Sequence, residues 1–212
     1  ANEPVDLIGI PVSADGRAKA LSYNIASLSA TERQCQMYTP WYILYGPFPL
    51  QIIPEQDPVT QNLLAYRLVG WGDRGEQMVW MDGRPHPSPN APHTHGGFST
   101  GTWDGISLKV VTTHFKMGDM KRHRAFSSDR ARMTYTLTRH DDILTVTGSL
   151  EDPVYLAEPF VLTEIFQLSS GTNGFPLTPC EPMEELPYLH ETPEVVPHYL
   201  PGKNPFMNEM TQ

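Results

Sequence analysis

Apolar and polar residues alternate along short segments in the middle of the chain. From about Trp41 to Leu168 the apolar positions recur every second residue, in runs rich in β-branched and aromatic residues. The runs read YILYG, LQII, LLAYRLV, QMVWM, SLKVVTTHF, MTYTLTR, ILTVTGSL and FVLTEIFQL. Turn residues separate them, and HDD at 140–142 lies between two clearly alternating runs as a hairpin tip. This pattern predicts an all-β fold, in which an antiparallel sheet closes into a calycin-like barrel or folds into a sandwich.

The alternation in ISLKVVTTHF assigns side chains to the two faces of its strand. Ile106, Leu108 and Val110 share one face with Thr112 and His114. Because the apolar side chains face the core, His114 is predicted to point inward at the end of this strand.

The last run, FVLTEIFQL, places a carboxylate among apolar side chains. Glu164 shares its face with Phe160, Leu162, Phe166 and Leu168. An inward carboxylate needs a partner or a raised pKa. The opposite face is an equally good core face, and it carries Val161, Thr163 and Ile165.

The segments on either side of the β-rich region have different patterns. Residues 13–30 carry Ala18, Leu21 and Ile25 at three- to four-residue spacing, which predicts one or two short helices. After Leu168 apolar residues stand between many prolines, which disfavour helix. We expect one domain over residues 1–212, with a helical or irregular segment at 1–34, a β body at 35–168 and an extended tail at 169–212 that wraps the sheet.

The charge of the chain argues against some partners. The formal net charge is −9, and the cationic residues are scattered except for KRHR at 121–124. A nucleic-acid surface usually needs a basic stripe, so no nucleic-acid partner is expected. No apolar run approaches the roughly 18 residues that cross a bilayer, so no membrane span is expected.

The first residue and the two cysteines favour export. The chain starts at Ala1 without a methionine or a signal-like stretch, which suggests that a signal peptide has been removed. Cys35 and Cys180 are an even number of cysteines, suited to one disulfide in an oxidising compartment. Two unrelated buried thiols are the alternative. We therefore expect a periplasmic or secreted protein.

Residues 89–105 read PNAPHTHGGFSTGTWDG and contain two histidines one residue apart. If the segment is extended, His93 and His95 face the same way, and His114 and His198 would complete a set of metal ligands. No HExxH, CxxC or acidic metal-binding loop accompanies them. A transition metal, zinc or copper, is therefore an alternative, and no other cofactor is assigned.

Acid–base chemistry without a metal is a second alternative. The candidate bases are His93, His114 and His140. Their candidate carboxylate partners are Asp82, Asp104 and Asp152. However, the DGR sequence at Asp82 is also typical of a turn. There the carboxylate accepts backbone N–H groups and Arg84 pairs with a carboxylate such as Glu151, and we favour this structural interpretation.

A binding protein is the function that we favour. A barrel of about eight strands holds one small, largely apolar molecule, and inward aromatic side chains would line it. The candidate ligand-binding residues are Tyr66, Trp80, Trp103 and Tyr135. A small-molecule enzyme is the first alternative, and a structural subunit of an envelope or extracellular assembly is the second. The oligomeric state is left open.

Several blocks together resemble a large family of secreted or periplasmic bacterial proteins. The blocks MDGRPHP, GFSTGTWDG and EDPVY match the family patterns M-D-G-R-x-H-P, G-x-S-x-G-x-W-x-G and E-D-P-V-Y, and the resemblance extends from about residue 15 to 207. It implies a signal peptide, an all-β body and export. It implies no activity, because the family's function is unknown. His95 and Glu164 depart from the family pattern, which has bulky apolar and neutral residues there.

Overall fold

The computed structural model describes residues 7–22, 35, 37–46, 49–70, 75–121 and 125–169. By its internal contacts the chain divides into residues 1–181 and 182–212, and all the described residues belong to the first unit. Cys180, His198 and the tail from residue 170 lie outside the described residues. The Cys35–Cys180 disulfide, a role for His198 and the wrapping tail therefore stay predictions.

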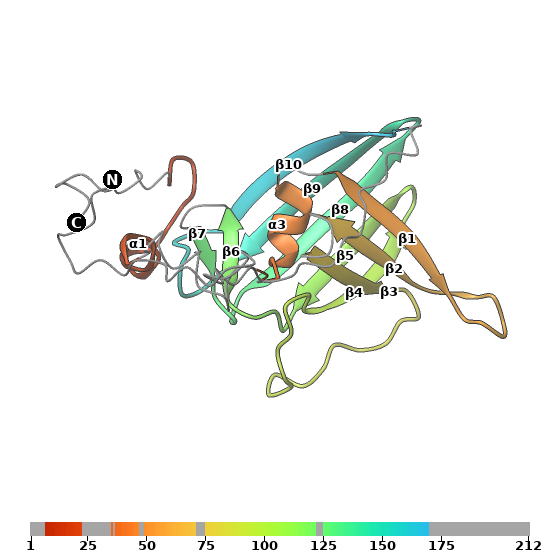
Figure 1. Ribbon diagram of the computed structural model, residues 1–212, viewed down its shortest axis with the longest axis horizontal. Coiled ribbons are helices and arrows are strands. Elements are labelled where there is room, and N and C mark those ends of the chain that lie inside the picture. Colours follow the sequence, from red (N-terminus) through yellow and green to blue (C-terminus); the bar gives the residue numbers. More distant parts are fainter. Residues whose placement is uncertain are drawn as a thin grey trace, which may run out of the picture. The chain divides into compact units, whose positions relative to one another are not determined.

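Eight strands form one curled sheet, a half-barrel (Figure 1). In spatial order they are β1 Leu50–Gln56, β2 Leu63–Gly70, β3 Gly75–Trp80, β4 Phe98–Asp104, β5 Ser107–Thr113, β8 Arg132–His140, β9 Ile143–Glu151 and β10 Phe160–Gln167. A separate two-stranded sheet contains β6 Gly118–Lys121 and β7 Ala125–Ser127. In the described part of the chain β1 and β10 are the edges and do not pair with each other. The predicted all-β fold class is confirmed.

Most neighbouring strands pair as the sequence predicts, but one pair does not. His140 pairs with Ile143 across the predicted hairpin tip. By contrast β3 and β4 run parallel, through only Val79↔Ser99 and Trp80↔Thr100. A parallel pair needs a long connection, which the proline-rich residues 81–97 provide. We call this β3–β4 pair the seam.

The prediction that the run YILYG forms a strand is wrong: the run lies in helix α3, Pro40–Tyr45, and ends at the residue that follows it. Pro40 occupies the first turn, where a helix tolerates proline because the N–H there has no partner within the helix. An all-apolar run without alternation fits a buried helix as well as a buried strand. The predicted N-terminal helix is found as α1, Ala14–Leu21, with the Ser13 side chain accepting a hydrogen bond from the Gly16 N–H at 3.0 Å.

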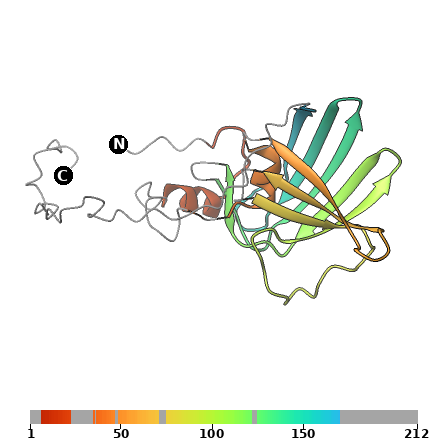
Figure 2. The same ribbon diagram turned by 45° about the vertical axis from the view of Figure 1, so that its right-hand side comes forward.

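The core lies between α3 and the side of the sheet that faces it, which we call the concave face. Trp41 and Leu44 of α3 are fully buried there. The concave side chains that pack with them include Leu68, Val79, Leu108, Val110, Met133, Tyr135, Val146 and Leu150. Figure 2 shows α3 at one end of the curled sheet, so the helix covers only part of the concave face.

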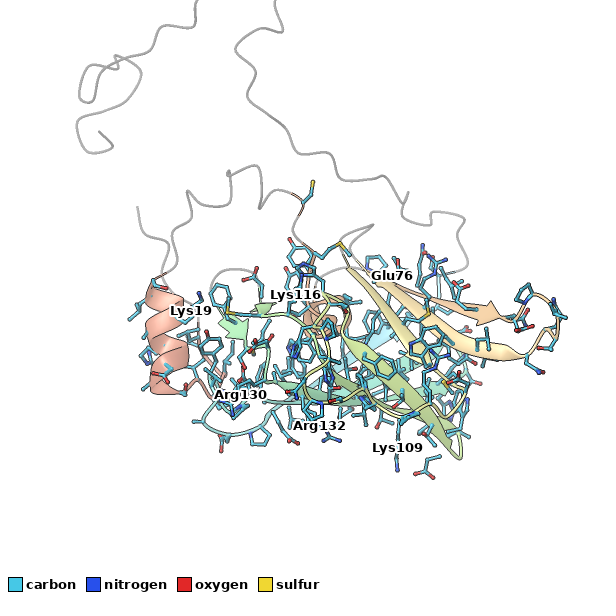
Figure 3. The ribbon with its side chains drawn as sticks, turned by 90° about the horizontal axis from the view of Figure 1, so that it is seen from below. Lys19, Glu76, Lys109, Lys116, Arg130 and Arg132 are labelled. Carbon is cyan, nitrogen blue, oxygen red and sulfur yellow. The ribbon has the colours of Figure 1, made fainter. Side chains whose placement is uncertain are left out.

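The other end of the half-barrel, away from α3 and α1, we call the open end. It consists of the turns at 57–62, 105–106 and 141–142 and the last residues of β10. In Figure 3, Lys109 beside the 105–106 turn lies on the opposite side of the sheet from Lys19 of α1. The three hairpins therefore point the same way, and their tips lie on one side of the molecule.

Candidate functional site

Three of the four predicted ligand-binding residues lie on the concave face. Tyr66 pairs with buried Val79, Trp103 pairs with buried Leu108, and Tyr135 is itself buried. Cross-strand partners share a face of the sheet, so these side chains point toward the α3 side.

Trp80 lies on the opposite, convex face. Its cross-strand partner is Ala65, and the Arg84 guanidinium lies 3.6 Å from the centre of its ring. This cation–π contact occupies one side of the indole. Placing Trp80 among the residues that line the interior is therefore wrong, because the alternation along β3 turns it outward.

Exposed apolar side chains gather at the open end. Trp103 is 52% exposed although it lies on the concave face, and Ile106 beside it is 70% exposed. The other hairpins and β10 add Val59, Ile143, Ile165 and Leu168. Single exposed apolar residues are ordinary, but a set on the tips of separate hairpins at one end indicates a binding surface.

Tyr135 belongs to a buried polar cluster that sequence reasoning missed. Its hydroxyl donates to Gln77 Oε1 at 3.0 Å, and Gln77 Nε2 donates to Ser99 Oγ and Thr112 Oγ1, both at 2.8 Å. Ser99 and Thr112 also bond to each other at 2.9 Å. The only sequence signal was Gln77 at an inward position of β3. With every amide hydrogen-bonding atom engaged, the cluster fixes the four strands β3, β4, β5 and β8 relative to one another.

His86 and His114 fasten the 81–97 loop to the convex face through a chain of hydrogen bonds. The Ser88 carbonyl can only accept, so His114 donates Nε2–H to it at 3.0 Å. Neutral His114 then accepts at Nδ1 from the Thr113 hydroxyl at 2.7 Å. The Thr113 oxygen accepts from His86 Nδ1–H at 2.9 Å, and His86 Nε2 accepts from Thr100 at 2.9 Å. The whole chain of bonds is therefore satisfied when both imidazoles are neutral.

The electrostatics around His86 agree with that neutral state. Burial, together with the charges of His114 and Arg132, lowers the pKa of His86 below its ordinary value. Burial and the nearby Lys116 lower the pKa of His95 in the same direction.

The predicted inward orientation of His114 is wrong. Strand β5 ends at Thr113, and His114 has a φ of 57°, in the left-handed region that breaks the alternation of faces. Its ring bonds to Ser88 and Thr113 at the edge of the convex face instead. Both ring nitrogens are used, so His114 holds the loop in this structure.

His93 is the histidine whose geometry most resembles a ligand or a base. Its Nδ1 donates to the Phe115 carbonyl at 3.2 Å, and its ring centre lies 5.1 Å from that of His114. A backbone carbonyl at Nδ1 leaves Nε2 as the basic nitrogen. Among the described residues, however, no group of three histidines, cysteines or carboxylates is close enough to hold a metal ion. The metal set with His95 and His198 thus stays a prediction.

The segment PNAPHTHGGFSTGTWDG forms the entry into β4. Gly97 has a φ of +68°, and a side chain on Gly96 would lie 2.5 Å from the Glu76 carbonyl oxygen. Both positions need glycine. The segment is therefore shaped first by its backbone.

The candidate carboxylates have structural partners. Asp82 pairs with Arg84 at 2.6 Å, which confirms the turn at DGR but places the partner within the turn rather than at Glu151. Asp104 pairs with Lys109. Buried Asp152 accepts from the Ser128 N–H and hydroxyl at 2.6 and 2.7 Å and also from the N–H groups of residues 154 and 155.

His140 lies at the exposed β8–β9 turn. Its side chain is 85% exposed and lies 3.3 Å from Asp141. The nearby apolar side chain, Ile143, is itself partly exposed. Apart from its carboxylate neighbour, His140 therefore has none of the surroundings that are typical of a catalytic base.

Comparisons with protein-family models, with curated proteins and with solved structures found no match. None of the described helices is long and apolar enough to span a bilayer. The side chains of the basic cluster at 121–124 lie outside the described residues.

Proposed function

We propose that this chain binds a small, largely apolar molecule at the open end of the concave face. The observation that carries the proposal is the exposure of Trp103, a large aromatic side chain on the face that otherwise forms the core. Tyr66 on β2 is partly exposed on the same face. Aromatic side chains on a concave face are typical of small-molecule sites.

The packing of the interior limits where the molecule binds. Leu108, Tyr135, Leu137 and Val146 are at most 5% exposed, so side chains already fill the middle of the concave face. Trp103 and the tips of the hairpins, by contrast, offer apolar surface to a ligand. The proposed site is therefore the rim of the half-barrel rather than its centre.

A neutral fluorescent probe, N-phenyl-1-naphthylamine, tests the proposal. We expect its fluorescence to rise on binding to the full chain and Trp103→Ala to weaken its affinity about tenfold, which is about 1.4 kcal/mol. Val161→Ala is the matched control, since it removes an exposed apolar side chain from the convex face at the end of β10 away from the open end. Absence of binding, or equal weakening by both substitutions, contradicts the proposal.

A His93-based enzyme is the second candidate, and it is favoured by His93 Nε2, which has no hydrogen-bond partner among the described residues. It ranks second because the described residues around His93 contain no carboxylate partner and no third metal ligand. Calorimetric titration with Zn²⁺ of protein purified without a metal-affinity step tests it. Stoichiometric binding that His93→Ala abolishes and His140→Ala leaves intact would support it, and no binding would remove the metal-dependent form.

Export also stays part of the proposal. It rests on the resemblance to secreted and periplasmic proteins and on the pair of cysteines, Cys35 and Cys180. A solvent-exposed apolar site suits a compartment in which the protein meets poorly soluble molecules.

A further inference from the structure

One side of the proposed site carries a carboxylate among apolar side chains. Phe160, Leu162 and Phe166 of β10 pack against the core, and Glu164 lies between them on the same concave face. Its cross-strand partner, Val146, is fully buried, whereas Glu164 itself is exposed. No cation among the described residues pairs with it. Because Glu164 is exposed, its carboxylate is open to a cationic partner from solution.

Trp103 and Glu164 are the two ends of one cross-strand row. The register runs from Trp103 to Leu108, Leu137, Val146 and finally Glu164. The three side chains between the ends are apolar and buried. The row therefore places an exposed aromatic side chain at one end and an exposed carboxylate at the other, with buried apolar side chains between them.

A buried hydroxyl lies close to this carboxylate. A β-carbon at Gly148 would lie 2.3 Å from Tyr45 Oη, so the hydroxyl rests directly on Gly148, which is a diagonal neighbour of Glu164 across β9 and β10. This oxygen is buried and has no hydrogen-bond partner in the described part of the chain. Burial, and to a lesser extent the charge of Glu164, raises the pKa of Tyr45 far above its ordinary value, so the phenol stays neutral. The Tyr45 hydroxyl therefore adds no charge beside Glu164, and the carboxylate is the charged group that a ligand can reach.

The charges of the open end have the same sign as Glu164. Its turns carry Asp57, Asp104, Asp141 and Asp142. The described cations there are Lys109, which pairs with Asp104, and Arg139, whose Nε donates to the Asp141 carbonyl. The surplus of carboxylates attracts a cationic ligand and repels an anionic one.

We propose that the molecule bound at the open end is a protonated amine with an apolar body. The apolar body lies against the exposed apolar side chains of the open end, and the ammonium group lies at Glu164. This inference rests on the proposed function, since it names the chemical class of the ligand for the same site.

Displacement of N-phenyl-1-naphthylamine by three eight-carbon compounds tests the inference on the full chain at neutral pH and low salt. Octylamine is a cation under these conditions, 1-octanol is neutral and octanoate is an anion. We expect octylamine to displace the probe at the lowest concentration and octanoate at the highest. Because Glu164 is exposed, Glu164→Gln is expected to weaken octylamine about fivefold and to leave 1-octanol unchanged.

Glu158→Gln is the matched control. Glu158 is exposed and precedes β10, at the end of that strand away from the open end, so this variant should bind all three compounds as the native protein does. Tyr45→Phe keeps the ring that packs 4.5 Å from Trp41 and should also bind all three compounds as the native protein does, because the hydroxyl that it removes is buried. In the native protein, added salt should weaken octylamine and not 1-octanol, which tests the charge without any substitution.

The outcomes separate the inference from the function on which it rests. If the probe binds but octanoate displaces it as well as octylamine does, or Glu164→Gln leaves octylamine unchanged, the amine inference is wrong and the apolar site stands. If the probe itself does not bind, the proposed function fails.

Discussion

At the scale of the residue, the buried amide of Gln77 is the polar group that links the most strands of the sheet. It is fully buried and bonds to three side chains from three other strands. A buried polar group costs little when all its hydrogen bonds are made and much when a partner is removed. Gln77 is therefore a structural residue, although a buried polar cluster at an inward position resembles a site.

Gln77→Ala is expected to lower the free energy of unfolding by about 3 kcal/mol, because it leaves the buried Tyr135 hydroxyl without its partner, removes one hydrogen bond each from Ser99 and Thr112, and opens a space in the core. Urea denaturation followed by circular dichroism measures the change. Gln167→Ala, at an exposed position on β10, is the control and should change the stability by less than about 0.5 kcal/mol. Equal effects of the two substitutions would show that the amide cluster does not stabilise the fold.

At the scale of the element, the 81–97 loop is a long connection held by imidazoles. His86 bonds to β4 and β5 at once, and His114 bonds to the loop backbone at Ser88. The edge of the His86 ring also meets Phe98, with ring centres 5.3 Å apart. Because the hydrogen-bond chain is complete with neutral rings, the loop is held most firmly above the pKa of His86.

The stability of the protein is expected to fall as the pH drops below about 6.5. The pKa of His86 is lower in the folded state than in the unfolded state, so below the unfolded value the unfolded chain takes up a proton that the folded one does not. The stabilisation is complete above that pH and is lost as the pH falls toward the lowered pKa. Urea denaturation at pH 7 and pH 5 measures the difference.

His86→Gln should make this pH dependence shallower. His140→Gln is the matched control, since its side chain is 85% exposed, and it should leave the slope unchanged. If the wild-type protein has the same free energy of unfolding at both pH values, the claim that neutral imidazoles hold the 81–97 loop is wrong.

The elements themselves show how far sequence patterns reach. Seven of the eight runs predicted as strands lie within or overlap strands, because their alternation is clear and turn residues separate them. YILYG was mistaken because an apolar run without alternation does not distinguish a buried strand from a buried helix. Strand β4 is not among the predicted runs, since its glycine, serine and threonine residues carry a weak apolar pattern.

At the scale of the whole molecule, the sequence predicted the all-β class but not the arrangement of the site. Trp103, Tyr66 and Tyr135 could be placed inward from alternation, whereas Trp80 could not be placed correctly without the register of β3. The cluster around Gln77 and the row from Trp103 to Glu164 depend on which strands are neighbours. Neighbour order is set by long-range packing, which a local pattern does not contain.

The seam has a consequence for how the chain folds. Three sets of antiparallel strands follow one another directly along the chain, so each set can pair through local contacts: β1, β2 and β3; β4 and β5; and β8, β9 and β10. Pairing β3 with β4 instead requires the 81–97 loop to close, and only two residue pairs form as a result. The chain therefore loses the conformational entropy of the loop before these contacts stabilise it. We expect strands β1–β3 to pair with the rest of the sheet late in folding and to separate from it early in unfolding. The hydrogen bonds of the Gln77 side chain hold the two parts together across the seam.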